Sequence, residues 1–217
     1  MRVVLIGPPG SGKGTQAGLL GARLNLTSVG TGEILRAAVR QNTPIGQAVG
    51  PLINQGLLAP DSVVNDLVAE LFRGAQRPDN FVTDGYPRTL AQAVAFDALL
   101  RQQFLQLDAV VNLAIGDDEV VRRIGNRRSC PNPTCGASYN LLTRPPKKAG
   151  ICERCGAALV LREDDREETV RRRLNEFHRC TDSLLEHYDR QGLLRTVSAL
   201  DPAETTFANI VRSTGVK

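Results

Sequence analysis

A glycine-rich segment that carries one lysine offers the clearest chemistry in the sequence. Gly7-Pro8-Pro9-Gly10-Ser11-Gly12-Lys13-Gly14-Thr15 directly follows the apolar run at residues 3–6. A strand, a glycine turn and a helix start in this order aim backbone N–H groups and the positive end of the helix at one anion. A plain tight turn would explain some of the glycines but would not require the lysine. The segment therefore predicts a loop that holds nucleotide phosphates through Gly10, Ser11, Gly12, Lys13, Gly14 and Thr15.

An acidic residue follows a second apolar segment. Asp84 comes after residues 81–83 and leads into Gly85-Tyr86-Pro87-Arg88-Thr89. Ligands of an open parallel sheet bind beyond the carboxyl ends of its strands, so we expect Asp84 near the phosphate loop as a contact to Mg²⁺. Arg88 could fork onto a phosphate. The alternative is that Asp84 and Thr89 only shape a turn between a strand and a helix.

Four of the five cysteines predict a structural zinc site. Cys130 and Cys135 form one pair with glycine behind it, and Cys152 and Cys155 form another. Both spacings fall within the range of zinc knuckles, and four thiolates would leave no open position for catalysis. Reduced, buried thiols without metal are the alternative. We expect Cys180 to take no part.

Short apolar runs alternate with amphipathic stretches, which predicts an α/β fold with a parallel sheet flanked by helices. Expected strands are residues 3–6, 26–29, 81–83, 109–113 and 193–197. Expected helices are residues 13–24, 31–54, 61–74, 89–102, 117–127, 164–188 and 202–212. Asp61, Thr89 and Asp164 are expected to be N-caps. Residues 129–162 contain the four cysteines and several prolines without helical periodicity, so they are expected to form an inserted small module.

The composition favours a cytoplasmic nucleotide enzyme. The 217 residues suffice for one α/β core with an insert, and the net charge is only +4. The short apolar start predicts no signal sequence, and no run is long enough for a membrane span. Clustered cysteines indicate a reducing compartment rather than a disulfide framework.

The motifs, in their order, resemble adenylate kinase over nearly the whole chain. They are residues 7–15, residues 31–36, residues 84–89 with Gln92, Arg123 and Arg127, and Arg162-x-Asp164-Asp165 with Arg173. The resemblance implies a monomer that converts Mg·ATP and AMP reversibly into two ADP on a P-loop core. It also implies a core of residues 1–29, 60–128 and 163–217, a helical AMP-binding flap of residues 30–59, and a zinc-ribbon-like lid of residues 129–162.

The resemblance further implies a role for each matching residue. Donor ATP would be held by the phosphate loop and by Arg123, Arg127, Ser138, Tyr139 and Leu200, with Arg123 or Arg127 on the adenine or the phosphates. AMP would be held by Thr31, Arg36, Leu57, Leu58, Ala59, Gly85, Tyr86, Pro87, Arg88, Gln92, Arg162 and Arg173. The catalytic cations would be Lys13, Arg88, Arg127, Arg162 and Arg173 with Mg²⁺, since phosphoryl transfer needs positioning and charge more than acid–base groups. His178 and His187 are expected to be surface or packing residues.

Two alternative functions stay open at this point. Another nucleoside monophosphate kinase would share the loop and the arginines, although Gln92 and Thr31 favour AMP. A zinc-ribbon nucleic-acid-binding protein could use the cysteines and the basic runs. Only nine aromatic residues and no tryptophan occur, and Tyr139 alone lies within the ribbon, so base stacking has little support.

Overall fold

The computed structural model describes residues 1–215. The chain divides into two compact units, which we describe separately. The first, here called the sheet unit, comprises Met1–Ile34, Ala59–Ile115 and Phe177–Lys217; the second, the cysteine unit, comprises Leu35–Leu58 and Gly116–Glu176. The finer three-part division into core, flap and lid stays a prediction.

The sheet unit contains five parallel strands in the order β2-β3-β1-β4-β7. Their bounds are β1 Arg2–Ile6, β2 Thr27–Gly30, β3 Phe81–Asp84, β4 Ala109–Ala114 and β7 Leu194–Ser198. The central strands consist almost entirely of buried apolar residues because both faces of a parallel sheet are covered. The predicted α/β class with a parallel sheet is thus confirmed, and each strand lies within a residue or two of its expected position.

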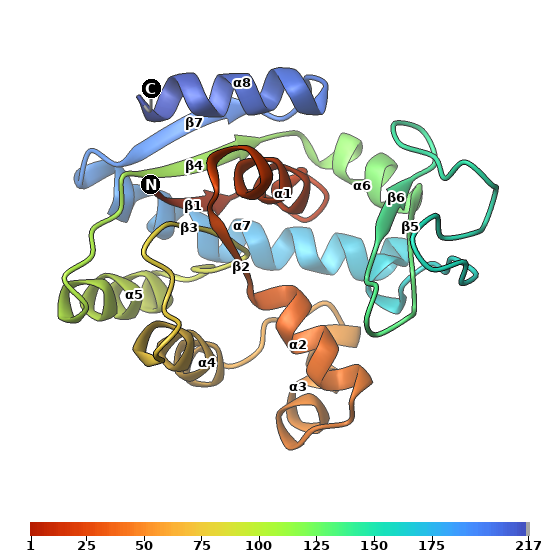
Figure 1. Cartoon of the computed structure of the whole chain (residues 1–217), viewed down its shortest axis with the longest axis horizontal. Coiled ribbons are helices and arrows are strands. Elements are labelled where there is room, and N and C mark those ends of the chain that lie inside the picture. The colour runs from red at the N-terminus through yellow and green to blue at the C-terminus, as the bar shows by residue number, and fades with distance from the viewer. Residues whose placement is uncertain (216–217) are drawn as a thin grey trace. The chain divides into compact units, whose positions relative to one another are not determined.

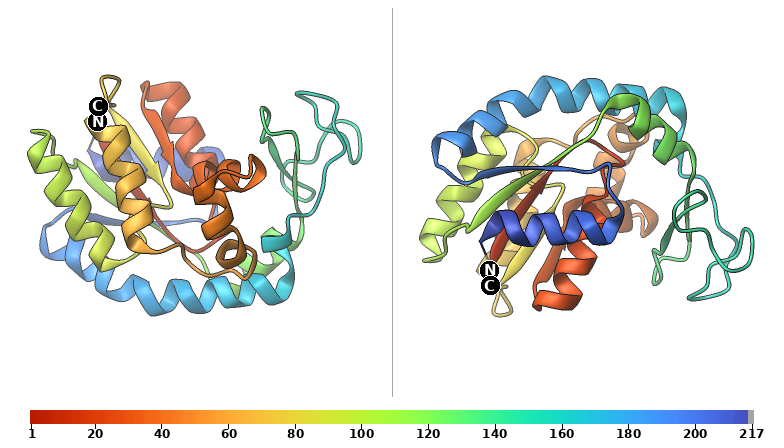
Figure 2. Two further views of the ribbon diagram at one scale, coloured as in Figure 1. Left: turned by 90° about the horizontal axis from the view of Figure 1, so that it is seen from below. Right: turned by 90° about the horizontal axis from the view of Figure 1, so that it is seen from above.

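Helices cover both faces of this sheet. Figures 1 and 2 show α1 (Lys13–Leu24) and α8 (Ala203–Thr214) on one face, with α4 (Asp61–Arg73), α5 (Leu90–Gln102) and the C-terminal part of α7 (Glu167–Arg190) on the other. Side chains alternate between the faces along a strand. Val82 therefore packs with Leu20 of α1 and Ile210 of α8, whereas Phe81 meets Phe72 of α4 edge-on at 5.0 Å between ring centroids.

The cysteine unit has much less regular structure. It contains most of α2 (Thr31–Arg40), α3 (Pro44–Asn54), α6 (Asp117–Gly125), the 3-10 turn Glu163–Asp165 and the start of α7. Its only paired strands within the described residues are β5 (Arg127–Ser129) and β6 (Ser138–Asn140), which run antiparallel. Most of residues 129–162 is irregular, as the sequence predicts for an inserted module. Of the helices in residues 1–215, none combines the length and the apolarity needed to cross a membrane.

The single helix expected at residues 31–54 is wrong, because the chain forms two helices there. α2 ends at Arg40, Asn42 adopts a left-handed backbone conformation, and Thr43 caps α3 by accepting a hydrogen bond from the Gly46 N–H. Pro44 at the first position of α3 lacks an N–H and could not continue a preceding helix. The apolar periodicity of the sequence continues across this break and therefore could not reveal it.

Two of the three predicted N-caps are also wrong. Thr89 does cap α5, with its hydroxyl accepting from the Gln92 N–H at 3.1 Å. Asp61 is the first residue inside α4, behind Pro60, and Asp164 lies buried in the 3-10 turn before α7. Both carboxylates bind side chains distant in sequence instead of their own helix ends. The helix expected at residues 117–127 ends at Gly125, so that Arg127 belongs to β5.

Candidate active site

The phosphate loop (residues 7–15) joins β1 to α1 as predicted, and its glycines are required by the backbone. Gly12, at the N-cap of α1, has φ 96°, in the left-handed region that disfavours side chains. Gly7 has φ 149°, and a Cβ there would lie 2.8 Å from Ser11 Oγ and 2.9 Å from the Leu113 carbonyl oxygen. The loop thus curls against β4 with its N–H groups leading into a helix start, the arrangement that attracts anions.

Lys13 lies over this loop. Its ammonium group donates to the Gly7 carbonyl at 2.6 Å and to the Pro8 carbonyl at 2.8 Å. These two hydrogen bonds keep the positive charge of Lys13 against the backbone of the loop. A bound phosphate would meet the Lys13 charge together with the N–H groups of the loop.

Asp84 meets the phosphate loop from the neighbouring strand. It pairs in register with Leu5 of β1, and its Oδ2 lies 3.1 Å from the place where a Cβ on Gly14 would be. The absent side chain of Gly14 therefore leaves room for the carboxylate beside the first turn of α1. Asp84 and the exposed Thr15 hydroxyl are oxygen ligands of the type that Mg²⁺ prefers, so these residues fit that ion.

The residues expected to bind AMP in the sheet unit gather at the ends of β2 and β3. The Gly85 carbonyl accepts from the Thr31 hydroxyl at 2.9 Å and from Arg88 Nε at 2.8 Å. Thr31 is buried, whereas Arg88 is exposed. One carbonyl thus positions both a hydroxyl and a guanidinium group next to the edge of the sheet where Asp84 lies.

Tyr86 and Gln92 are far more buried than residues that simply line a surface. Tyr86 is 1% exposed; its ring packs edge-on against Phe96 at 5.2 Å, and its hydroxyl donates to Asn65 Oδ1 at 2.9 Å. Burial, aided by the charges of Asp61 and Asp97, raises the pKa of Tyr86. Gln92 is also 1% exposed, and its amide binds Asp61 and the Arg88 backbone. Asp61 is a member of this site that the sequence analysis missed.

In the cysteine unit, the buried carboxylates of Asp164 and Asp165 interact with arginines that are predicted to bind substrate. Arg127 binds Asp165 through two nitrogen atoms, with Nε at 2.8 Å, and Arg173 donates to Asp164 Oδ2 at 3.2 Å. Arg36 lies 3.9 Å from the same Asp164 oxygen. Burial raises the pKa of Asp164, but the positive charges of Arg173, Arg36, Arg127 and Arg162 outweigh it and hold that pKa below its usual range. The acidic pair thus gathers three of the predicted catalytic cations, Arg127, Arg162 and Arg173, together with Arg36.

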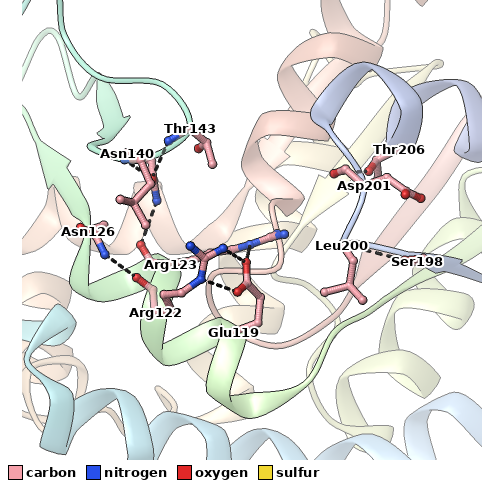
Figure 3. A network of polar contacts seen from close by, with 11 residues as sticks. Glu119, Arg122, Arg123, Asn126, Asn140, Thr143, Ser198, Leu200, Asp201 and Thr206 are labelled. Carbon is pink, nitrogen blue, oxygen red and sulfur yellow. Dashed lines mark hydrogen bonds and ion pairs between the residues drawn. The ribbon is translucent and has the colours of Figure 1, made fainter.

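Arg123 has a different partner from that cluster (Figure 3). Its Nε donates to Glu119 Oε1 at 2.7 Å, and Arg122 binds the same carboxylate. Hydrogen bonds from Arg122 and then Arg123 lower the pKa of Glu119 to about 2. Asn140 Nδ2 donates to the Arg123 carbonyl at 3.0 Å, so β6 is tied to the end of α6.

The remaining candidates lie in connecting segments, apart from Ser138, which is the first residue of β6. Leu200 follows β7 and is 64% exposed, and its backbone N–H donates to Ser198 Oγ at 3.2 Å, as Figure 3 shows. Leu57 and Leu58 follow α3 in the cysteine unit, and the Leu57 N–H donates to the Leu52 carbonyl at 2.9 Å. Ala59 opens the next segment of the sheet unit and is buried, as is Pro87, while Ser138 is exposed.

The four predicted cysteines do form one cluster. Their sulfur atoms all lie within 4.8 Å of one another, with Cys130 and Cys155 at 3.3 Å and Cys135 and Cys152 at 3.6 Å. Ligands about 2.3 Å from a tetrahedral zinc ion are about 3.8 Å apart, so the four thiols fit zinc. Cys180 is not a member of the cluster, as expected. The wider spacing from Cys130 to Cys135 is absorbed by a turn in which the Cys135 N–H donates to the Asn132 carbonyl.

The thiols of this cluster differ in their proton affinity. Burial, reinforced by hydrogen bonds with the other three thiols, raises the pKa of Cys130 to about 12. Burial would also raise the pKa of Cys152, but hydrogen bonds from Tyr139 and the backbone N–H groups of Arg154 and Cys155 lower it to about 6. The Tyr139 hydroxyl lies 3.6 Å from Cys152 Sγ and accepts from the Glu153 N–H at 2.9 Å. Tyr139 therefore contacts a predicted metal ligand, and the sequence analysis did not predict this contact.

Comparison with known proteins agrees with this geometry. The sequence model of the family described as adenylate kinase matches residues 5–193. An adenylate kinase of Lachnospira eligens is 38% identical over 215 residues, which cover 99% of this chain and all of that protein. One of Streptomyces avermitilis is 41% identical over 204 residues, covering 94% of this chain and 92% of its own, and one of Caldicellulosiruptor bescii is 38% identical over the full length of both. This chain therefore belongs to the adenylate kinase family, whose members are nucleoside monophosphate kinases.

Proposed function

We propose that the protein transfers the terminal phosphoryl group of Mg·ATP to AMP and that the reaction, which is reversible, yields two ADP. An oxygen of the AMP phosphate attacks the terminal phosphorus of ATP, and the bond to the leaving ADP breaks. The observation that carries the proposal is the meeting of the phosphate loop, Asp84 and the Gly85–Arg88 turn at one edge of the sheet. In this proposal, the phosphates of the donor and of the acceptor would both bind at that edge.

The donor triphosphate is assigned to residues 10–15. The loop N–H groups and the start of α1 hold the phosphates, and Lys13 neutralises the charge that moves to the leaving ADP. Arg123 or Arg127, Ser138, Tyr139 and Leu200 are assigned to the rest of the donor nucleotide on the basis of the family. Since Glu119 and Asp165 already orient the two arginines, their side chains lose less entropy when they bind.

The acceptor AMP is assigned to Thr31, Arg36, Leu57, Leu58, Ala59, Gly85, Tyr86, Pro87, Arg88 and Gln92. Arg88 would bind the AMP phosphate and Gln92 its base. Arg162 and Arg173, with Arg127, would bind the equatorial oxygens of the group in transfer. Fixed positive charges stabilise such a transition state without a general base, which suits the absence of any histidine from these motifs.

Two metal ions complete the proposal. Asp84 and Thr15 would hold Mg²⁺, directly or through water, and the ion would supply positive charge that neutralises the donor phosphates. Cys130, Cys135, Cys152 and Cys155 would hold a structural Zn²⁺, which supplies cross-links in residues 129–162 and has no open position for substrate. We further propose that the enzyme acts as a cytoplasmic monomer without a nucleic-acid partner.

A direct assay tests the proposed reaction. ADP formation from Mg·ATP should require AMP, with two ADP formed for each AMP consumed, and AMP should be a better acceptor than GMP, UMP or dTMP. Equal turnover of GMP or UMP would contradict the acceptor assignment while leaving a nucleoside monophosphate kinase. Sedimentation of the purified protein tests the monomer, and filter binding of single-stranded DNA at physiological salt tests the nucleic-acid alternative.

A further inference from the structure

The side-chain amide of Gln92 is held at both ends by groups of fixed polarity. Its Nε2 donates to Asp61 Oδ1 at 2.7 Å, and its Oε1 accepts from the Arg88 backbone N–H at 2.8 Å. An ionised carboxylate can only accept a hydrogen bond, and a backbone N–H can only donate one. The orientation of the amide therefore follows from its partners.

Thr89 closes the same network. Its hydroxyl donates to Asp61 Oδ2 at 2.9 Å and accepts from the Gln92 backbone N–H at 3.1 Å. Both oxygens of Asp61 are thus used within one small group of side chains. Turning the Gln92 amide over would place its oxygen against the carboxylate and its NH₂ group against the Arg88 N–H. Because Gln92 is 1% exposed, water could not readily compensate for these two losses.

A glutamine amide that could turn freely would not distinguish purines that differ at position 6. A 6-aminopurine presents a donor beside a ring-nitrogen acceptor, and a 6-oxopurine presents the reverse pattern. An unrestrained amide can match either pattern by rotating through 180°. After the two bonds above, Gln92 retains one N–H hydrogen and one oxygen lone pair for a base. The restraint on the amide, more than the amide itself, then decides which base is accepted.

We propose that Asp61 is a specificity-determining positioning residue, which fixes the polarity of Gln92 so that a 6-aminopurine monophosphate is accepted and its 6-oxo counterpart is rejected. The inference rests on the proposed function, in which Gln92 contacts the acceptor base. Asp61 acts through Gln92 and not on the substrate. Its place as the first residue of α4, together with Thr89 as the N-cap of α5, ties base selection to two helix starts.

AMP and inosine monophosphate, which differ only in this pattern, are the probes. In Asp61→Asn the side chain keeps its shape but can offer either an NH₂ group or a carbonyl oxygen to Gln92. We expect the ratio of kcat/KM for AMP to that for inosine monophosphate to fall by about tenfold, the effect of losing one or two such bonds. The change should appear as a higher KM for AMP and a lower one for inosine monophosphate. Asp66→Asn, at an exposed position on the same helix, should leave the ratio unchanged.

The outcomes separate this inference from the proposed function. A wild-type enzyme that uses both acceptors equally would overturn the assignment of AMP as the preferred acceptor. A wild-type preference for AMP that Asp61→Asn leaves intact would overturn only the role of Asp61. A purely structural Asp61 would lower the melting temperature without changing the ratio. If Asp61→Asn does not fold, Asp61→Ser provides the same ratio test, because its hydroxyl can also donate or accept.

Discussion

The phosphate loop and residues 129–162, here called the cysteine module, are both irregular segments, but different interactions stabilise them. The loop connects β1 and α1, whose side chains Leu5, Ala17 and Leu20 are buried in a large apolar cluster of the sheet unit. The buried cluster of the cysteine module consists of Cys130, Ala137, Tyr139 and Cys152. Two of these four residues are predicted metal ligands, so the module has little apolar core of its own.

This difference suggests that the phosphate loop contributes mainly to catalysis and the cysteine module mainly to folding stability. In the phosphate loop, the glycines and the neighbouring strands fix the backbone, and a single side chain, Lys13, brings the positive charge. In the cysteine module, the thiols themselves are a large part of what holds the backbone in place. Substitutions in the first region should therefore affect turnover, and substitutions in the second should affect folding and metal content.

The largest expected effect is the loss of turnover in Lys13→Ala. Removing one preorganised cation from the phosphates should lower kcat by about 10²- to 10³-fold, while the melting temperature stays near that of the wild type. Steady-state kinetics and calorimetry measure the two quantities. Lys147→Ala, at an exposed position in the cysteine module, is the matched control and should retain full activity. Near-normal turnover of Lys13→Ala would contradict the assignment of the phosphate loop.

Cys152→Ser, or removal of metal by a chelator, should have the opposite pattern. We expect elemental analysis to show the loss of about one zinc ion per chain. The melting temperature should also fall, because the ion would link all four cysteines of the module. Part of the activity should persist, since Lys13 and Arg88 lie in the sheet unit. Cys180→Ser should keep its zinc. A wild-type protein purified without chelator that contains no metal would refute the zinc site.

The sequence predicted the phosphate loop and the four-cysteine cluster well because each depends on spacing along a short segment. Residues 7–15 form their loop between neighbouring elements, and two cysteine pairs are recognisable from local motifs. The partners of Asp61, Asp165 and Tyr139 could not be predicted, since Asp61 binds Gln92, 31 positions away, and Asp165 binds Arg127, 38 positions away. Such contacts depend on which segments, distant in sequence, the fold brings together. Local sequence patterns predicted only helix capping for Asp61 and Asp164. In the structure, both carboxylates bind side chains from other parts of the chain instead of capping a helix.

The smallest expected effect concerns Tyr139, which would sharpen the comparison by testing a group that supports the metal ligands without being one. Its hydroxyl lies 3.6 Å from Cys152 Sγ and accepts from the Glu153 N–H, so it links one thiol to the backbone of the Cys152–Cys155 knuckle. Removing such a partner typically costs about 10- to 100-fold in metal affinity. Tyr139→Phe should thus release zinc to a competing chelator about tenfold more readily.

Tyr188→Phe is the matched control, because that hydroxyl lies 3.5 Å from Asp97 in the sheet unit. It should release zinc at the wild-type rate even if it alters the melting temperature. Zinc release that is equal in Tyr139→Phe and the wild type would show that the thiols alone hold the module. In that case the phenol ring would serve packing only, and the cysteine module would resemble the phosphate loop in tolerating the loss of a polar side chain near its centre.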